Sequence, residues 1–324
     1  MKKKIFRVLI VLIVVLVAVF YLLVVPKVVS LITDYPRYTF EYVTEDTAMV
    51  SNYAIFDNRN PADYGYPNYQ TVDYKSWKDD INLNGWYIPA SKDSITKTLV
   101  ISHGRTANRL KTMKYLQVIK EYGLDSMYHV FIPDHRNSGK SQEASTAMGY
   151  KFAEDIAGVL KMLKTNYGHQ EFTLWGFSMG AMATATLINR PDTKAFLEEE
   201  DIQIDAMILA SPVSNVEATV KLGSDNMGVP SFVFNICFNR FSSITDDYVD
   251  NMKFSYLLNN NKKPTLVLYG TADASTPAPM LEEEIKGLSH VEAHSFADAE
   301  HVQLYTQPQF RQHYGDLVNE FLRR

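Results

Sequence analysis

The chain has 324 residues, of which 46% are hydrophobic, and a formal net charge of −5 at pH 7. This length is enough for one large domain, and the acidic balance argues against a nucleic-acid partner, because phosphate binding needs a basic face. A single cysteine, Cys237, excludes an intrachain disulfide and any multi-cysteine metal site.

The first 32 residues predict a membrane anchor. Residues 8–25 form an uninterrupted run of apolar and aromatic residues, VLIVLIVVLVAVFYLLVV. At about 1.5 Å per residue, this run and its flanks are just long enough to cross a hydrocarbon core of roughly 30 Å. Basic residues precede the run, so we expect a single-pass cell-membrane protein with a cytoplasmic N-terminus and an extracytoplasmic body. These residues are Lys2, Lys3, Lys4 and Arg7.

A cleaved signal peptide is the alternative interpretation of this segment. The apolar region of a signal peptide is usually only about 7–15 residues long and ends in small residues at the cleavage site. Ala18 is the one small residue within the run, and bulky residues follow it. A retained helix over residues 1–32 therefore fits the sequence better.

Residues 33–80 are rich in tyrosine, asparagine, aspartate and proline, and we expect a surface lead-in with edge strands, one of them at 39–43 (TFEYV). From residue 81 to 324, strand patterns and helix patterns alternate along one domain. Strands are expected at 81–90, 96–102, 127–133, 171–177, 204–211, 264–270 and 291–297. Helices are expected at 108–122, 152–168, 179–190 and 307–324, with Pro191 closing the third.

Near-continuous apolar strands separated by helices indicate an α/β fold, with a mostly parallel central sheet and helices on both faces. Residues 212–262 contain no clear strand but many aromatic residues, and we expect them to form a small helical lid above the sheet. The aromatic side chains are expected to form the lid's own core or, alternatively, a wall of an acyl-binding site. They are Phe232, Phe234, Phe238 and Phe241.

The segment EFTLWGFSMGAMATATL, residues 171–187, places a serine where a predicted strand meets a predicted helix. Gly176 and Gly180 lie two residues before and after Ser178, which removes the side chains that would collide in so sharp a turn. This G-x-S-x-G pattern predicts a nucleophilic Ser178 at the carboxyl edge of the sheet. A loop serine between turn glycines is the alternative.

A serine hydroxyl needs a base to take its proton. Of the eight histidines, His301 is the expected base, because it follows the last predicted strand and so lies at the same sheet edge as Ser178. Asp273, just after the sixth predicted strand, is expected to orient it. Asp298 and Glu300 are rivals, but residues so near His301 in one loop are badly placed to reach the far ring nitrogen.

Attack on a carbonyl creates an oxyanion, which needs backbone N–H donors placed in advance. We expect one donor from Met179, the residue after the nucleophile, and one from Arg105, in the loop after the strand at 96–102. His103 is then expected to be structural. A solvated or structural role is the simpler expectation for three arginines near these motifs, and binding of an anionic substrate group is the alternative. They are Arg105, Arg109 and Arg136.

Five segments together resemble the α/β-hydrolase family: HGR at 103–105, DHRNSGKS at 134–141, GFSMG at 176–180, GTAD at 270–273 and the histidine of AEH at 299–301. The second segment is similar to the family's D-x-R-x-x-G-x-S loop, with Asn137 where many members carry glycine. In its overall organisation the chain resembles bacterial membrane-anchored hydrolases related to serine aminopeptidases and monoacylglycerol lipases. The resemblance, which covers about residues 80–324, implies the α/β-hydrolase fold, a Ser-Asp-His triad and a lid.

The sequence thus predicts a serine hydrolase, tethered by one N-terminal helix, that cleaves an ester, thioester or amide through an acyl-enzyme. We favour an ester of a small or medium acyl group, because nothing suggests a dedicated peptide-binding domain. One alternative is an aminopeptidase or amidase, with Glu217, Asp246 or Asp247 binding the substrate's amino group. Another is a catalytically silent member that binds a ligand at the cell surface. No G-x-G or H-E-x-x-H pattern occurs, so no cofactor or metal is expected.

Overall fold

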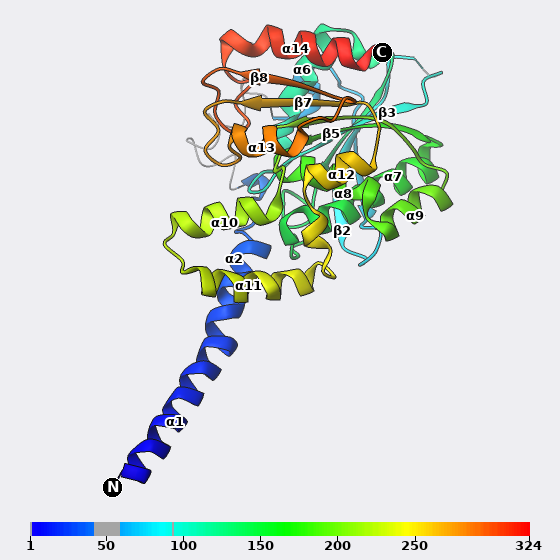
Figure 1. Cartoon of the computed structure of the whole chain (residues 1–324). Helices are drawn as coiled ribbons and strands as arrows, with labels where there is room; N and C mark the ends of the chain where they lie inside the picture. The colour runs from blue at the N-terminus through cyan, green and yellow to red at the C-terminus, as the bar shows by residue number, and fades with distance from the viewer. Residues whose placement is uncertain (1, 42–58, 93) are drawn as a thin grey trace.

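The computed structural model describes residues 2–41, 59–92 and 94–324 and is organised around one eight-stranded sheet (Figure 1). Its strands are Gln70–Lys75 (β1), Asn82–Ile88 (β2), Lys97–Ser102 (β3), His129–Asp134 (β4), Glu171–Phe177 (β5), Gln203–Ala210 (β6), Thr265–Gly270 (β7) and Val291–Phe296 (β8). Their order across the sheet is β1-β2-β4-β3-β5-β6-β7-β8. β2 is antiparallel to β1 and β4, and the other neighbouring strands are parallel. The predicted fold class is confirmed.

Helices cover both faces of the sheet, because successive strand residues point to opposite sides. In β3, Val100 packs into one hydrophobic core, while Leu99 and Ile101 pack into the other. The Leu99 face is covered by Arg109–Thr112 (α5), Leu116–Glu121 (α6) and Pro308–Leu322 (α14). The Val100 face is covered by Tyr150–Tyr167 (α7), Met179–Asn189 (α8), Pro191–Glu199 (α9) and Ala278–Ile285 (α13). Short 3₁₀ turns lie at Pro61–Tyr64, Met113–Tyr115, Leu124–Ser126, Ala147–Gly149 and Tyr248–Asn251.

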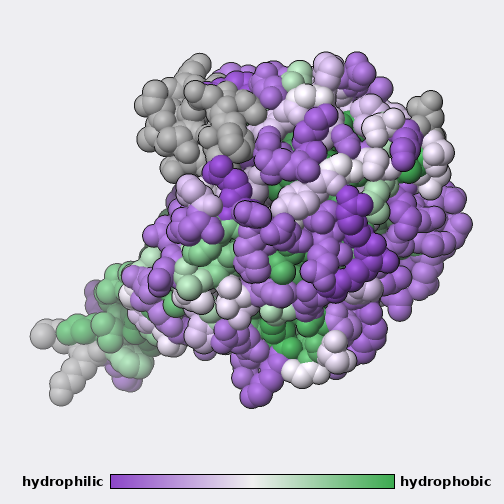
Figure 2. Space-filling model, turned by 90° about the horizontal axis from the view of Figure 1, so that it is seen from above, coloured by the Kyte–Doolittle hydropathy of each residue, from purple (hydrophilic) through white to green (hydrophobic). Residues whose placement is uncertain are grey.

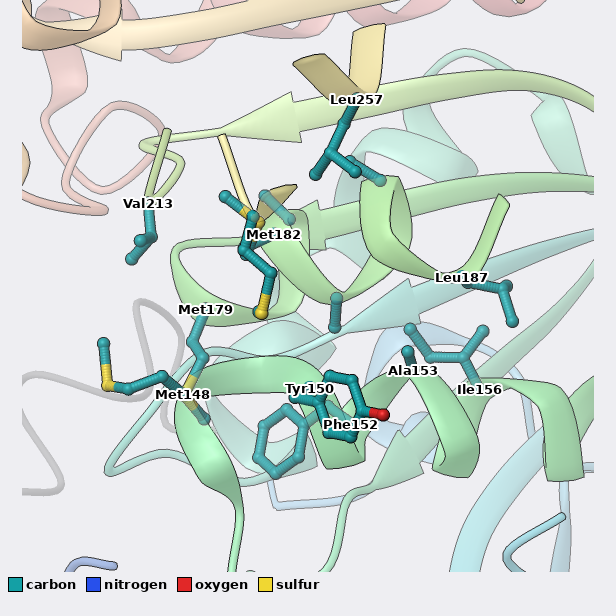
Figure 3. Close-up of a cluster of buried hydrophobic side chains, with 14 of the residues drawn as sticks. Met148, Tyr150, Phe152, Ala153, Ile156, Met179, Met182, Leu187, Val213 and Leu257 are labelled. Atoms are coloured by element: carbon teal, nitrogen blue, oxygen red, sulfur yellow. The ribbon is translucent and has the colours of Figure 1, made fainter. Parts of the chain in front are cut away.

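The core on the Val100 face extends toward the carboxyl edge of the sheet between α7 and α8 (Figure 3). Phe152 and Ile156 of α7 face Met182 and Leu187 of α8 there, and Met148 and Met179 lie at one end of the cluster. This rigid packing supports the loop that precedes α7 and the first turn of α8.

The segment between β6 and β7 is helical, as expected for a lid. It contains Val216–Asn226 (α10), Ser231–Ile244 (α11) and Phe254–Asn260 (α12). Phe234, Phe238 and Phe241 are buried in this segment, and the rings of Phe234 and Phe238 stack at 5.3 Å. Phe232, in contrast, is 65% exposed.

Three details differ from the sequence predictions. No strand forms over residues 39–41, because Phe40 and Glu41 are helical; residues 42 and 43 lie outside the described residues. Pro191 does follow the end of α8, but it also begins α9, since a proline at the first helical position loses no hydrogen bond. The helices α9 and α13 are also not among those predicted from the sequence.

The N-terminal segment is one continuous helical rod made of Lys2–Val19 (α1), a π-helical turn at Phe20–Val24 and Val25–Thr33 (α2). Lys3–Thr33 is long and apolar enough to cross a membrane, and an 18-residue window within it has a mean hydropathy of 3.6. Side chains over residues 5–24 are almost all exposed, and Figure 2 shows this rod as a hydrophobic projection from a mostly hydrophilic body. In α2, by contrast, Val25, Val29 and Thr33 are buried at helical spacing, so α2 packs on the domain.

Buried neutral histidines should make the fold sensitive to mild acid. Burial lowers the pKa of His135 well below its ordinary value and that of His169 to about 4. In the unfolded chain these histidines are protonated below pH ~6.5, whereas in the folded chain they stay neutral to a lower pH. Their contribution to the free energy of unfolding is therefore fully present above pH ~6.5 and is lost as the pH falls toward the folded-state pKa. We expect the free energy of unfolding to drop between pH 7 and pH 5, by about 2 kcal/mol from His169, with His135 contributing in the same direction. Thermal unfolding in detergent micelles measures this, and equal midpoints at the two pH values would contradict it.

Candidate active site

Ser178 lies on a sharp turn between β5 and α8. Its backbone has φ 51° and ψ −116°, an uncommon conformation for a residue with a side chain. The two flanking glycines explain why the turn is possible. A Cβ on Gly176 would lie 2.6 Å from the Ala181 Cα, and one on Gly180 would lie 2.7 Å from the Ser102 carbonyl oxygen. The pentapeptide therefore fits the strand–turn–helix geometry of a nucleophile elbow.

A methyl group on Gly180 should disturb both stability and the position of Ser178. In Gly180→Ala the added carbon meets the backbone carbonyls of Ser102, the last residue of β3, and of His103, the residue after it. We expect a loss of about 1–3 kcal/mol in unfolding free energy, as for other overpacked sites, together with a lower kcat. Gly223→Ala is the matched control for stability: it is also a helical glycine, but its added carbon has no neighbour within 4 Å. Equal unfolding midpoints for the two variants would refute this account.

The structure brings His301 and Asp273 to Ser178. His301 lies in the loop after β8, and its Nε2 is 2.9 Å from the Ser178 Oγ. Its Nδ1 is 2.7 Å from Oδ2 of Asp273, which lies in the loop after β7. The rival carboxylates, Asp298 and Glu300, have no hydrogen bond to His301 among the contacts of the described residues. The three side chains thus form a continuous chain of hydrogen bonds at the carboxyl edge of the sheet.

Asp273 is held in an ionised, oriented state by its own loop. The backbone N–H groups of Ser275 and Thr276 donate to Oδ1 at 2.9 and 2.8 Å, and the Thr276 hydroxyl donates to Oδ2 at 2.8 Å. Burial by itself raises the pKa of Asp273, but hydrogen bonds from His301 and Thr276 outweigh it and bring the pKa below its ordinary value. Sequence reasoning missed Thr276; its signal was the D-x-x-T spacing, typical of a side chain–backbone turn.

The loop after β3 lies directly against the nucleophile. A Cβ on Gly104 would lie 2.9 Å from the Ser178 Cβ, so only glycine allows this approach. Arg105 and Met179, the expected oxyanion donors, both line the pocket that contains Ser178. Their role as oxyanion donors stays a prediction.

His103 is a structural residue in this geometry. It is fully buried, and its Nε2 accepts the backbone N–H of His135 at 3.0 Å while its Nδ1 lies 2.7 Å from the Gly104 carbonyl oxygen. Burial lowers its pKa. A neutral ring with both nitrogens engaged has no free position with which to take a proton from Ser178.

Two of the three arginines are structural. Arg136 is buried and pairs with Asp155 and Asp79 through several hydrogen bonds. Arg109 is buried between Asn84 and the ring of Trp86. Arg105 differs, because its guanidinium lines the Ser178 pocket and donates to carbonyls at the end of α2.

The Ser178 pocket has a volume of about 260 Å³ and is lined by both polar and apolar groups. Met148, Thr219 and Lys111 line it, although sequence reasoning did not single them out. The acidic residues considered for amino-group recognition, Glu217, Asp246 and Asp247, are absent from its described lining. Within residues 2–41, 59–92 and 94–324, no group of three or more histidine, cysteine or acidic side chains is arranged to hold a metal ion.

Comparison with known proteins is consistent with this geometry. Residues 97–229 match the family model described as the alpha/beta hydrolase fold. The chain is 34% identical to Bacillus subtilis YqkD over 102 residues, which is 31% of this chain and 32% of YqkD. It is 23% identical over 305 residues to the lysophosphatidylserine lipase ABHD12 of Xenopus tropicalis, covering 83% of this chain and 72% of the lipase.

Solved structures show the same fold. The Pyrococcus furiosus esterase Pf2001 superposes with a TM-score of 0.62 and 25% identity, covering 82% of this chain and 94% of the esterase. The esterase EaEST of Exiguobacterium antarcticum gives a TM-score of 0.52 at 17% identity, covering 78% of this chain and 99% of EaEST. The sheet order and these likenesses show the α/β-hydrolase fold, and together with the family match over residues 97–229 they support membership of the α/β-hydrolase family.

Proposed function

We propose that the protein is a membrane-anchored serine hydrolase that cleaves a carboxylic ester through an acyl-enzyme. The observation that carries this proposal is the 2.9 Å contact between the Ser178 Oγ and the His301 Nε2, with Asp273 on the other ring nitrogen. His301 takes the hydroxyl proton as Ser178 attacks the carbonyl carbon. The backbone N–H groups of Met179 and Arg105 stabilise the oxyanion.

The second half of the reaction restores the enzyme. His301 donates the proton to the departing alcohol, and the acyl group stays on Ser178. Water then gives a proton to His301 and attacks the acyl carbon, so that the acid leaves and Ser178 regains its hydrogen. Asp273 keeps its charge throughout and stabilises the imidazolium that forms in each half.

An ester is favoured over an amide by two observations. Relatives and structural neighbours include a lipase and esterases. An aminopeptidase would need an acidic group beside Ser178, yet Asp246 instead accepts a hydrogen bond from the Tyr150 hydroxyl and does not line the pocket. The assembled hydrogen-bond chain also disfavours a catalytically silent binder.

The anchor places this chemistry at a membrane surface. Residues 5–24 span about 30 Å at 1.5 Å per residue, which matches a bilayer's hydrocarbon core. The basic residues before them favour a cytoplasmic N-terminus and an extracytoplasmic active site.

The bond specificity is tested with full-length protein in detergent micelles. A series of p-nitrophenyl esters is compared with aminoacyl-anilides, and we expect ester hydrolysis with little release of aniline. Turnover of anilides with negligible ester hydrolysis would overturn the choice of bond. No hydrolysis of either class by folded protein would favour the silent binder.

A further inference from the structure

An apolar groove lies between α2 and the lid helices α10 and α11, which adjoin α2 in Figure 1. Its volume is about 170 Å³. Most of the residues that line it are apolar, so the groove suits an alkyl chain, and its polar lining residues are Arg105, Thr219 and Ser224. The lining of this α2 groove includes Val28, Leu31, Ile32, Val220, Gly223 and Cys237.

The α2 groove adjoins the Ser178 pocket. Arg105, Met148 and Thr219 line both spaces, and the Arg105 Nη1 lies 3.6 Å from the Met148 Sδ. Met148 has φ 51°, a strained backbone conformation that persists only where surrounding contacts stabilise it. The two spaces together exceed roughly 300 Å³, the lower end of ordinary small-molecule sites. A substrate with its carbonyl at Ser178 can therefore extend a tail past Met148.

The position of α2 is fixed by loops of the active site. The Arg105 Nη2 donates to the carbonyl oxygens of Leu31 at 2.7 Å and Asp34 at 2.8 Å. Thr146, in the loop before α7, donates to the Thr33 carbonyl through both its hydroxyl (2.6 Å) and its backbone N–H (3.0 Å). The end of α2 is thus attached to Arg105, which lines the Ser178 pocket, and α2 itself is a wall of the adjoining α2 groove.

The α2 groove lies beside the helix that continues the proposed membrane span. α2 continues the helical rod of α1 without a break. Met227 and Phe232, on either side of the α10–α11 turn, are 67% and 65% exposed, and Leu31 is 54% exposed. Large exposed apolar side chains beside an anchor helix suit contact with lipid. The groove can therefore receive an alkyl chain directly from the bilayer.

We infer that the substrate is a single-chain amphiphilic ester drawn from the bilayer, whose acyl chain lies in the α2 groove, so that the membrane helix forms part of the substrate site. This inference rests on the proposed ester hydrolysis for its chemistry. It adds what the triad leaves open: the class of acyl group and the path by which the ester reaches Ser178.

Two substitutions block the α2 groove from opposite walls. Gly223→Phe places a ring where a Cβ has no neighbour within 4 Å, and replacing a helical glycine favours the helix. Leu31→Trp enlarges an exposed side chain on the α2 wall. Asn226→Phe is the matched control, since this exposed α10 residue lies outside the groove.

The test uses full-length protein in phosphatidylcholine nanodiscs. The measured quantity is the ratio of kcat/KM for p-nitrophenyl dodecanoate to that for p-nitrophenyl acetate. Both blocking variants should lower this ratio by about tenfold or more, since small changes in an apolar subsite have effects of this order. Asn226→Phe should leave it unchanged. If both blocking variants keep the wild-type ratio, the acyl chain does not use the α2 groove, while ester hydrolysis itself stands.

A binding measurement separates this inference from the proposed chemistry. Fluorescent dodecanoyl glycerol is titrated into Ser178→Ala protein in the same nanodiscs. Adding Gly223→Phe should raise Kd at least tenfold, whereas adding Asn226→Phe should not. If binding depends on the groove but the wild type does not hydrolyse the ester, the α2 groove is still the acyl-chain site and the proposed ester hydrolysis is wrong. Equal Kd values for all three proteins would overturn the groove.

Discussion

Replacement of Ser178 by alanine is expected to lower kcat for an ester by about 10⁴- to 10⁶-fold. The reason is local: the Oγ that is 2.9 Å from the His301 Nε2 belongs to the residue that carries the proposed nucleophile and lines the pocket. KM should change little, because the lost interaction is made in the transition state and not in substrate binding. Steady-state kinetics with a p-nitrophenyl ester gives both quantities.

Covalent labelling provides the control for this variant. A fluorophosphonate probe should label the wild type and Ser243→Ala, in which an exposed lid serine is removed, but not Ser178→Ala. Similar thermal midpoints for the three proteins show that the fold is intact. Retained labelling of folded Ser178→Ala would place the nucleophile elsewhere and end the proposal.

The second large effect is expected for Asp273→Asn, with kcat lowered by about 10⁴-fold. The asparagine side chain keeps the size of Asp273 but can present an N–H group to the His301 Nδ1, 2.7 Å from the present Oδ2. The ring is then driven to the tautomer whose Nε2 carries hydrogen and is unable to accept the Ser178 proton. The carboxylate's negative charge, which stabilises the imidazolium, is also lost.

The neighbouring acids supply the matched controls. Asp298→Asn and Glu300→Gln alter carboxylates that lie close to His301 in sequence but are exposed. We expect both variants to retain most of the wild-type kcat. If either of them loses as much activity as Asp273→Asn, the assignment of Asp273 as the orienting group is wrong.

The α/β architecture could be predicted because its signals are local. Strands such as β5 and β7 are buried along nearly their whole length and are apolar on both faces, while α7 shows helical spacing and ends at Gly168. α9 escaped prediction because a proline was interpreted only as a helix end, although a proline fits the first helical turn equally well. Short, half-polar α13 has too weak a pattern to be recognised.

The N-terminal helix shows the limit of what local sequence patterns predict. Residues 8–25 are uniformly apolar, and nothing in that pattern separates exposed residues from residues that pack on the domain. In the structure, Val25 and Val29 are buried against the domain, whereas residues 5–24 are almost all exposed. The contact between Arg105 and the Leu31 carbonyl joins residues 74 positions apart, and no periodicity encodes it.

The amino-acid sequence by itself determined the alternation of strands and helices, the glycine-flanked serine and the order of the candidate site residues, because periodicity and glycine sterics act within a few residues. Only the tertiary structure decided which carboxylate contacts His301, how closely the β3 loop approaches Ser178, and that the end of the N-terminal helix is a wall of the groove beside the pocket. These features depend on contacts between distant segments, such as the 123 positions that separate Ser178 from His301. Such contacts are set by how the whole sheet and its helices pack.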